Sequence, residues 1–293
     1  MVDTGKNIAA ITIGGRSFDW GSRTYVMGIV NATTDSFSGD GLSTDVDAAI
    51  TQALAFQAAG SDIIDVGGES SRPPGTAYGQ GAELVSADEE LSRVIPIIEG
   101  LRDELDVPIS IDTYKADVAR QAIASGASLI NDVWGLQRDP DLARVAAETG
   151  VPIVLMHNQA GTEYTDLMTD VLAGMRKSVD AARRAGVVEE AIIVDPGIGF
   201  GKTVQHNLEL LRRLREFKDV LGHPVLMGVS RKSTIGTVLG GLPPDDRLEG
   251  TAAAISMSIA NGADIVRVHD VKAMVRVVRM TDAIVRGWTP PAS

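Results

Sequence analysis

The chain has 293 residues, of which 44% are hydrophobic and 23% charged, a composition typical of a globular domain with a large core. It has no cysteine, which excludes disulfides and thiolate metal sites, and its formal net charge of −12 disfavours non-specific binding to nucleic acid or to a membrane surface. No apolar run reaches the roughly 18 residues of a membrane-spanning helix, and the N-terminus lacks the pattern of a signal peptide. We therefore expect a cytoplasmic protein.

The first 24 residues contain an alternating segment around a pair of glycines. The stretch AAITIGGRSFDW alternates apolar and polar residues on both sides of Gly14–Gly15. Two short strands joined by a glycine turn form a β-hairpin. We predict that this hairpin covers the bottom of the larger structure that follows.

Eight short apolar runs come next, and each is predicted to be a β-strand. Their continuous Val, Ile and Leu content is typical of parallel strands covered on both faces. The runs are Tyr25–Asn31, Asp62–Gly68, Pro108–Thr113, Leu129–Val133, Pro152–His157, Ala191–Gly197, Pro224–Ser230 and Ile265–Asp270.

Helical patterns alternate with these strands. The predicted helices are Val46–Ala59, Ala87–Leu105, Ala116–Ser125, Pro140–Thr149, Leu167–Ala185, Val204–Val220, Arg247–Asn261 and Val271–Arg286. Strand, loop and helix repeated eight times predict a (β/α)8 TIM barrel, with a doubly wound open sheet as the structural alternative. No segment has the composition of a linker, so we expect one domain over residues 1–293.

Polar side chains stand where the predicted strands end, which is where the active site of such a barrel lies. In chain order the ends carry Asn31, Asp65 with Glu69, Asp112, Asn131, Met156–His157, Asp195, Ser230 with Lys232, and Arg267 with His269. The acceptors Asp112, Asn131 and Asp195 suit a flat heterocycle with several N–H groups. Lys232, Arg267, His269 and Arg72 instead offer donors suited to phosphate. The pattern predicts one ligand with a heterocyclic half and a phosphate half.

The motifs around these ends resemble those of dihydropteroate synthase. In order they read GIVNATTDSFSGDG, DVGGESSRP, SIDT, LIND, DPGIGFGK, SRKS and RVHDV, and they extend over most of the chain. The resemblance implies a transferase that condenses 6-hydroxymethyl-7,8-dihydropterin pyrophosphate with p-aminobenzoate in folate biosynthesis. Its implied partners are these small-molecule substrates, with no nucleic acid and no membrane.

The resemblance also implies a role for each residue of the site. The pterin would contact Asp112, Asn131, Met156, Asp195, Phe200 and Lys232. The pyrophosphate would contact Asn31, Ser71, Arg72, Arg267 and His269, with Asn31 also a ligand of Mg²⁺. The arylamine would contact Asp35, Phe37 and Arg72, and the implied catalytic residues are Asn31, Asp35, Lys232, Arg267 and His269.

The implied reaction begins with dissociation of pyrophosphate, and the amine attacks afterwards. Such a reaction needs positive charge beside the leaving group, which Mg²⁺, Arg267 and His269 would supply. It also needs an anion near the carbon that becomes positive, and Asp35 is the candidate. The polar loop that follows Asn31 would then be a lid, in which Phe37 packs against the aromatic amine.

Some loop positions depart from the usual pattern of the family. They are Thr34 in place of Pro, Ser71 in place of Thr, Asn158 in place of Met and Thr234 in place of Phe. None removes an expected ligand of the pterin or the pyrophosphate, so we expect them to affect arylamine affinity more than the type of reaction.

Other interpretations stay open from sequence alone. A pterin-binding methyltransferase barrel would share the strand-end Asp and Asn residues, and a Schiff-base aldolase would use Lys232 as its nucleophile. A catalytically weak paralogue would bind a pterin or a protein partner. The late segment Gly250–Gly262 is apolar on more than one side, which predicts either a buried barrel helix or a homodimer interface.

Overall fold

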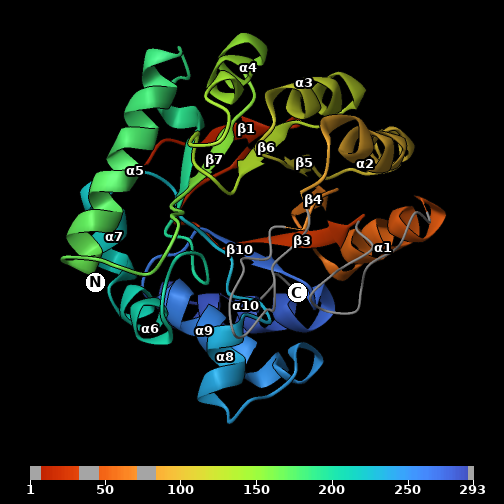
Figure 1. The fold of residues 1–293 in the computed structure, drawn as a ribbon. Helices are drawn as coiled ribbons and strands as arrows, with labels where there is room; N and C mark the ends of the chain where they lie inside the picture. Colours follow the sequence, from red (N-terminus) through yellow and green to blue (C-terminus); the bar gives the residue numbers. More distant parts are fainter. Residues whose placement is uncertain (1–7, 33–45, 71–83, 290–293) are drawn as a thin grey trace.

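The computed structural model describes residues 8–32, 46–70 and 84–289. Its centre is an eight-stranded parallel sheet with helices around it (Figure 1). The strands are β3 (Tyr25–Asn31), β4 (Ile63–Gly67), β5 (Ile109–Asp112), β6 (Leu129–Asp132), β7 (Ile153–Met156), β8 (Ile192–Asp195), β9 (Leu226–Met227) and β10 (Ile265–Val268).

The sheet closes into a barrel. Its strands pair in the order β8-β7-β6-β5-β4-β3-β10-β9, so the first strand of the barrel lies beside the last. The two remaining edges meet through a parallel bridge between Val194 and Val225, where the Val194 N–H donates to the carbonyl of Pro224 at 2.9 Å. The predicted TIM barrel is confirmed, and the doubly wound open sheet was the wrong alternative.

The helices that alternate with the strands largely match their predicted ranges. They are α1 (Val46–Ala59), α2 (Ala87–Leu101), α3 (Ala116–Ser125), α4 (Asp141–Thr149), α5 (Leu167–Arg184), α6 (Val204–Arg212), α7 (Leu214–Leu221), α8 (Ser233–Val238), α9 (Leu248–Ala260) and α10 (Val271–Arg286). The single helix predicted over Val204–Val220 is wrong, because the chain leaves helical geometry at Arg213. Helix α8 was not predicted.

The N-terminal hairpin is present as predicted. It pairs β1 (Ile11–Ile13) with β2 (Arg16–Phe18) in antiparallel register, and both turn glycines have positive φ, +53° at Gly14 and +79° at Gly15. Two consecutive residues of positive φ define the tight turn whose twist matches a hairpin. Buried side chains of the hairpin cluster with the interior residues Met27, Leu129 and Ile193 of the barrel, so the hairpin covers its amino-terminal end.

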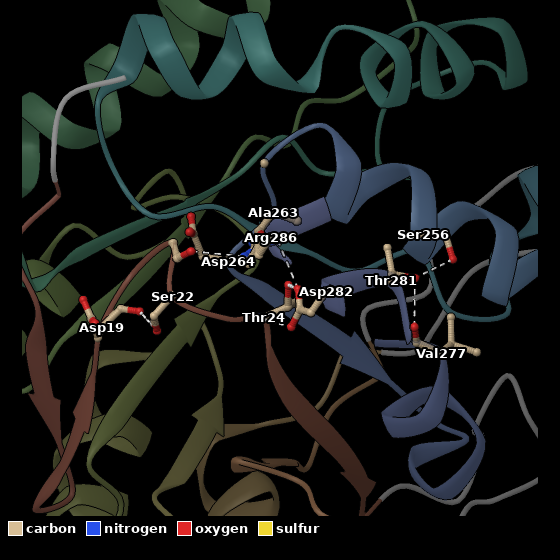
Figure 2. Close-up of polar contacts among 12 residues, drawn as sticks. Asp19, Ser22, Thr24, Ser256, Ala263, Asp264, Val277, Thr281, Asp282 and Arg286 are labelled. Carbon is tan, nitrogen blue, oxygen red and sulfur yellow. Dashed lines mark hydrogen bonds and ion pairs between the residues drawn. The ribbon is translucent and has the colours of Figure 1, made fainter. Parts of the chain in front are cut away.

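Polar contacts at this end hold the C-terminal helix in place (Figure 2). The carboxylate of Asp282 in α10 accepts bonds of 2.8 Å from the backbone N–H and from the hydroxyl of Thr24, just before β3. Arg286, one turn further on, binds Asp282 at 3.1 Å and the carbonyl of Ala263 at 3.4 Å. Helix α10 is thereby tied to the starts of both β3 and β10. None of the described helices is long and apolar enough to cross a bilayer.

Candidate active site

A cavity lies at the carboxyl ends of the strands, where the sequence predicted the site. Most of the predicted site residues line it: Asn131, Met156, Asp195, Phe200, Lys232, Arg267 and His269. The rest of its lining is formed by Ile29, Val133, Ile198, Gly228, Ser230 and Arg231. Because parallel strands of a barrel all end at the same rim, residues far apart in the chain meet here.

Arg267 on β10 lies between two buried carboxylates. Its Nε is 2.6 Å from Oδ2 of Asp65, and its Nη2 is 2.6 Å from Oδ2 of Asp112. Asn131 donates from Nδ2 to the same oxygen of Asp65 at 3.1 Å. Burial raises the pKa of Asp112 to about 7, although the charge of Arg267 opposes this shift. Arg267, which is expected to contact the pyrophosphate, is therefore ion-paired with Asp112, an expected pterin ligand. It is also paired with Asp65, which Asn131 contacts as well.

Asp195 ends β8 as a buried carboxylate. Its Oδ1 accepts a hydrogen bond of 2.7 Å from the backbone N–H of Gly197, and no described residue donates to its Oδ2. Burial raises its pKa to about 6, while the Gly197 N–H and the charge of Lys232 lower it. An ionised carboxylate with an open oxygen in a buried cavity is well suited to accept N–H groups from a ligand.

Lys232 and Phe200 form one wall of the cavity. The ammonium of Lys232 lies 4.1 Å from the centre of the Phe200 ring, which is a cation–π contact. Burial, assisted by the charge of Arg267, lowers the pKa of Lys232 to about 8. Phe200 also packs with Met156 and Val133, which makes this wall apolar apart from the ammonium.

His269 faces the cavity from the loop after β10. Its Nδ1 is 3.0 Å from the hydroxyl of Ser230, which also accepts the His269 backbone N–H at 3.2 Å. Burial and the neighbouring cations, Arg267 first, lower the pKa of His269 well below its usual value. When Ser230 donates to Nδ1 of a neutral imidazole, the ring proton is on Nε2, which can then donate to a ligand oxygen.

The loops that carry Lys232 and His269 are joined by an ion pair. Arg231 binds Asp270 through Nε at 2.9 Å and through Nη2 at 2.6 Å. Each of these residues is the immediate neighbour of a cavity residue, Arg231 of Lys232 and Asp270 of His269. The pair therefore holds the two loops next to each other.

Asn31 is the last residue of β3 and is half-buried at the same rim. It pairs in the sheet with Gly67 at the end of β4. Its side chain has no hydrogen-bond partner among the described residues. The end of β3 therefore carries an amide for which the described residues supply no partner.

Part of the predicted site lies outside the described residues. This part consists of Thr34, Asp35, Phe37, Ser71 and Arg72. The contacts with pyrophosphate and with the arylamine expected of Asp35, Phe37, Ser71 and Arg72 stay predictions.

The sequence reasoning missed several residues that support the site. Asp65 was seen at a strand end but was given no role, and it is the main partner of Arg267. Lys202 was seen in a loop that resembles a phosphate-binding loop without matching it, but was given no role. Its buried ammonium donates to the carbonyl of Phe200 at 2.9 Å and contacts Nδ1 of His157 at 3.0 Å. The glycines at 197, 199 and 201 could have indicated this role, because a Gly-rich loop needs a nearby side chain to hold its backbone in one conformation.

Glu69 proves to belong to a structural cluster. Its carboxylate binds Lys115, whose ammonium also binds the buried Glu90 on α2. Within residues 8–32, 46–70 and 84–289, no group of three or more His, Asp or Glu side chains is arranged to hold a metal ion.

Known proteins resemble this chain in sequence and in structure. Residues 27–269 match the family model described as pterin binding enzyme. The dihydropteroate synthase of Clostridium beijerinckii is 51% identical over 275 residues, covering 94% of this chain and 99% of that protein. The dihydropteroate synthase of Bacillus subtilis is 53% identical over 262 residues, or 89% of each chain.

Solved structures agree with these matches. A Clostridium difficile dihydropteroate synthase, crystallised in the presence of pteroic acid, has a TM-score of 0.85 and 50% identity, covering 92% of this chain and 99% of that one. The Xanthomonas albilineans enzyme with 4-aminobenzoic acid has a TM-score of 0.86 and 40% identity, covering 94% and 97%. The chain therefore belongs to the pterin-binding enzyme family and, within it, to the dihydropteroate synthases.

Proposed function

We propose that this protein condenses 6-hydroxymethyl-7,8-dihydropterin pyrophosphate with p-aminobenzoate to give 7,8-dihydropteroate and pyrophosphate. The observation that carries the proposal is a single cavity in which the buried acceptor Asp195 lies with the cations Lys232 and Arg267. Relatives that share the fold have been solved with 4-aminobenzoic acid and with 7,8-dihydropteroate.

The acidic side of the cavity suits the pterin. Asp195 would accept N–H groups from the amino-pyrimidinone edge, while Asn131 and Asp112 would contact the remaining polar atoms of the ring system. The Phe200–Met156 wall would cover the flat face of the rings, and Lys232 would donate to a ring acceptor. Support comes from the raised pKa of about 6 at Asp195, because a ligand that donates to the charged carboxylate relieves the cost of burying it.

Arg267 and His269 would act on the leaving group. The bond between the exocyclic carbon and the pyrophosphate oxygen breaks, and its electron pair goes to that oxygen. Arg267 would stabilise the developing negative charge, while His269 would donate a hydrogen bond from Nε2. The amine of p-aminobenzoate then forms the new C–N bond and releases a proton. We propose that Asp35 stabilises the positive charge on carbon during this sequence.

The residues described fit a magnesium ion that is bound largely by the substrate. Mg²⁺ prefers oxygen ligands and keeps several waters together with substrate phosphate oxygens, so it needs few protein ligands. The half-buried Asn31 side chain offers one amide oxygen at the rim of the barrel. When bound there, Mg²⁺ would neutralise charge on the pyrophosphate.

We further propose that the enzyme is a cytoplasmic homodimer. Its proposed substrates are small and polar, and the chain has no cysteine. Helices α9 and α10 expose apolar side chains, among them Met257 at 53%, Met280 at 63% and Ile284 at 71%. Apolar exposure of this kind on adjacent helices supports a protein interface. Ile284→Glu would shift a dimer to monomer in analytical ultracentrifugation.

Release of pyrophosphate tests the proposed reaction. The purified protein is mixed with dihydropterin pyrophosphate, p-aminobenzoate and Mg²⁺, and pyrophosphate and dihydropteroate are measured together. Equal amounts of both products are expected, with none from Asp195→Asn and less after chelation of Mg²⁺. A wild type that binds the pterin but releases no pyrophosphate would instead be a catalytically weak paralogue.

A further inference from the structure

Phe200 and Lys232 belong to different loops, and one buried side chain bonds both to the Phe200 loop and to α8, the helix that follows Lys232. Asn207 on α6 is 2% exposed. Its Oδ1 accepts the backbone N–H of Gly199 at 2.9 Å, and its Nδ2 donates to Oγ1 of Thr234 at 2.8 Å. Gly199 precedes Phe200, and Thr234 lies in α8, two residues after Lys232. A single amide therefore links the two halves of the cavity wall.

The two loops approach each other closely at Gly199. This glycine has a φ of +84°, and a Cβ placed on it would lie 3.1 Å from Cδ of Lys232. The Lys232 ammonium in turn lies 4.1 Å from the centre of the Phe200 ring. Because the backbone of one loop touches the side chain from the other, a small displacement between the loops changes the shape of the wall.

Other side chains hold the Phe200 loop without contacting α8. Tyr164 donates from its hydroxyl to the carbonyl of Gly201 at 2.8 Å, and Lys202 donates to the carbonyl of Phe200 at 2.9 Å. Tyr164 thus holds the loop to the segment between β7 and α5, and Lys202, which also contacts His157, holds it to the end of β7. The Asn207 amide differs from these contacts, because it bonds both to this loop and to α8.

We propose that Asn207 and Thr234 are positioning residues that hold Phe200 and Lys232 at the spacing a pterin requires. The inference rests on the proposed function, because it assigns a purpose to the wall of the proposed pterin site. Neither residue lines the cavity, so both would act through the residues that do. The hydroxyl of Thr234 is the essential chemical feature, since without it the buried Asn207 amide would lack an acceptor.

Binding of a pterin that lacks the pyrophosphate tests this role directly. With 6-hydroxymethylpterin in calorimetry, Asn207→Leu is expected to raise Kd at least tenfold, equivalent to about 1.4 kcal/mol. Thr234→Val should raise it about fivefold, whereas Thr234→Ser should stay within about twofold of wild type because it keeps the hydroxyl. The double variant Asn207→Leu/Thr234→Val should bind no more weakly than Asn207→Leu alone. In steady-state kinetics, KM for the pterin substrate should rise more than kcat falls.

A matched control separates positioning from general stability. Ser61 is a buried hydroxyl at the opposite end of the barrel, and its one proton is shared between the carbonyls of Ile63 at 2.8 Å and Val26 at 3.1 Å. Ser61→Ala should lower the melting temperature. It should leave pterin Kd within about twofold of wild type, because Ser61 shares no contact with the described residues of the cavity.

Each outcome decides a different question. Wild-type pterin affinity in Thr234→Val, or equal weakening in Thr234→Ser or Ser61→Ala, would overturn the positioning role and leave the proposed function intact. A wild type that binds no pterin would overturn the proposed function, and the inference with it. If Asn207→Leu does not fold, the pterin Kd of Thr234→Val compared with that of Thr234→Ser tests the positioning role instead.

Discussion

Replacing Asp195 with asparagine is expected to stabilise the empty protein while removing its affinity for a pterin. Asp195 is 5% exposed, and burial raises its pKa from 3.8 to about 6. Its one hydrogen bond within the described protein is accepted from the Gly197 N–H, and an asparagine oxygen can accept the same bond. The substitution therefore removes a buried charge without breaking the local structure.

The size of the effect follows from the two pKa values. The folded protein keeps the Asp195 proton until about pH 6, whereas the unfolded chain releases it near 3.8. The stability that the protonated Asp195 carboxyl gives to the folded protein is therefore full below pH 3.8 and is lost as the pH rises through 6. Each pKa unit corresponds to about 1.4 kcal/mol, so the ionised carboxylate lowers the free energy of unfolding by about 2–3 kcal/mol at pH 7. Asparagine does not titrate and avoids this loss.

Urea unfolding of ligand-free protein between pH 4 and 7 measures the difference. The two proteins should be nearly equal at pH 4, and the Asp195→Asn variant should be more stable by about 2–3 kcal/mol at pH 7. Asp264→Asn is the matched control. Asp264 is fully buried, but its oxygens lie 2.8 and 2.7 Å from Nζ of Lys218. Removing that charge should destabilise the protein by about 3–5 kcal/mol.

Either half of this prediction can fail by itself. A variant that is no more stable than wild type at any pH would show that burial of the Asp195 carboxylate carries no penalty. A variant that binds 6-hydroxymethylpterin with wild-type affinity in calorimetry would show that Asp195 is not a pterin ligand.

Other predictions concern pH and the phosphate side of the site. Pterin affinity should fall about tenfold per pH unit below 6, because protonated Asp195 is a weaker acceptor; a flat profile in binding titrations would contradict this. Arg267→Ala should lower turnover by about 10²-fold or more, and it should reduce stability by about 3–5 kcal/mol because Asp65 and Asp112 lose their cation. Steady-state kinetics and urea unfolding check both effects, and unchanged turnover would remove Arg267 from the mechanism. His269→Ala should also lower turnover about 10²-fold, yet it should leave binding of a pterin without pyrophosphate within about threefold. If His269→Ala lowered the affinity for that truncated ligand as much as it lowers turnover, the assignment of His269 to the pyrophosphate would be wrong.

The barrel could be predicted because its strands are covered on both faces and so read as continuous apolar runs. The prediction was poorest where local sequence carries little signal. The run Pro224–Ser230 contains a strand of only two residues, Leu226–Met227, and Gly228 and Ser230 after it line the cavity. The break at Arg213 has neither Pro nor Gly to mark it, and α8 is too short to show a helical period.

The site was predicted in part because barrel topology places all strand ends at one rim. The contacts between those ends could not be read from the chain. Arg267 and Asp65 are separated by 202 positions, and nothing near either residue indicates that they pair. Asn207 looked like an ordinary helix residue, since its contacts depend on how the loop at Gly199 and helix α8 lie against α6. Local pattern identifies the donors and acceptors, but tertiary structure decides which of them meet.

The pairing of β3 with β10 has a consequence for how the chain folds during synthesis. Residues 25–28 pair with residues 265–268, so one edge of β3 has no partner until nearly the whole chain has been made. At 5–20 residues per second, ribosomal synthesis leaves that edge open for roughly 10–50 s. An unpaired, apolar strand edge is a template for pairing with other chains. Chains truncated before residue 265 should therefore aggregate, and the last tenth of the protein is what protects the first strand of the barrel.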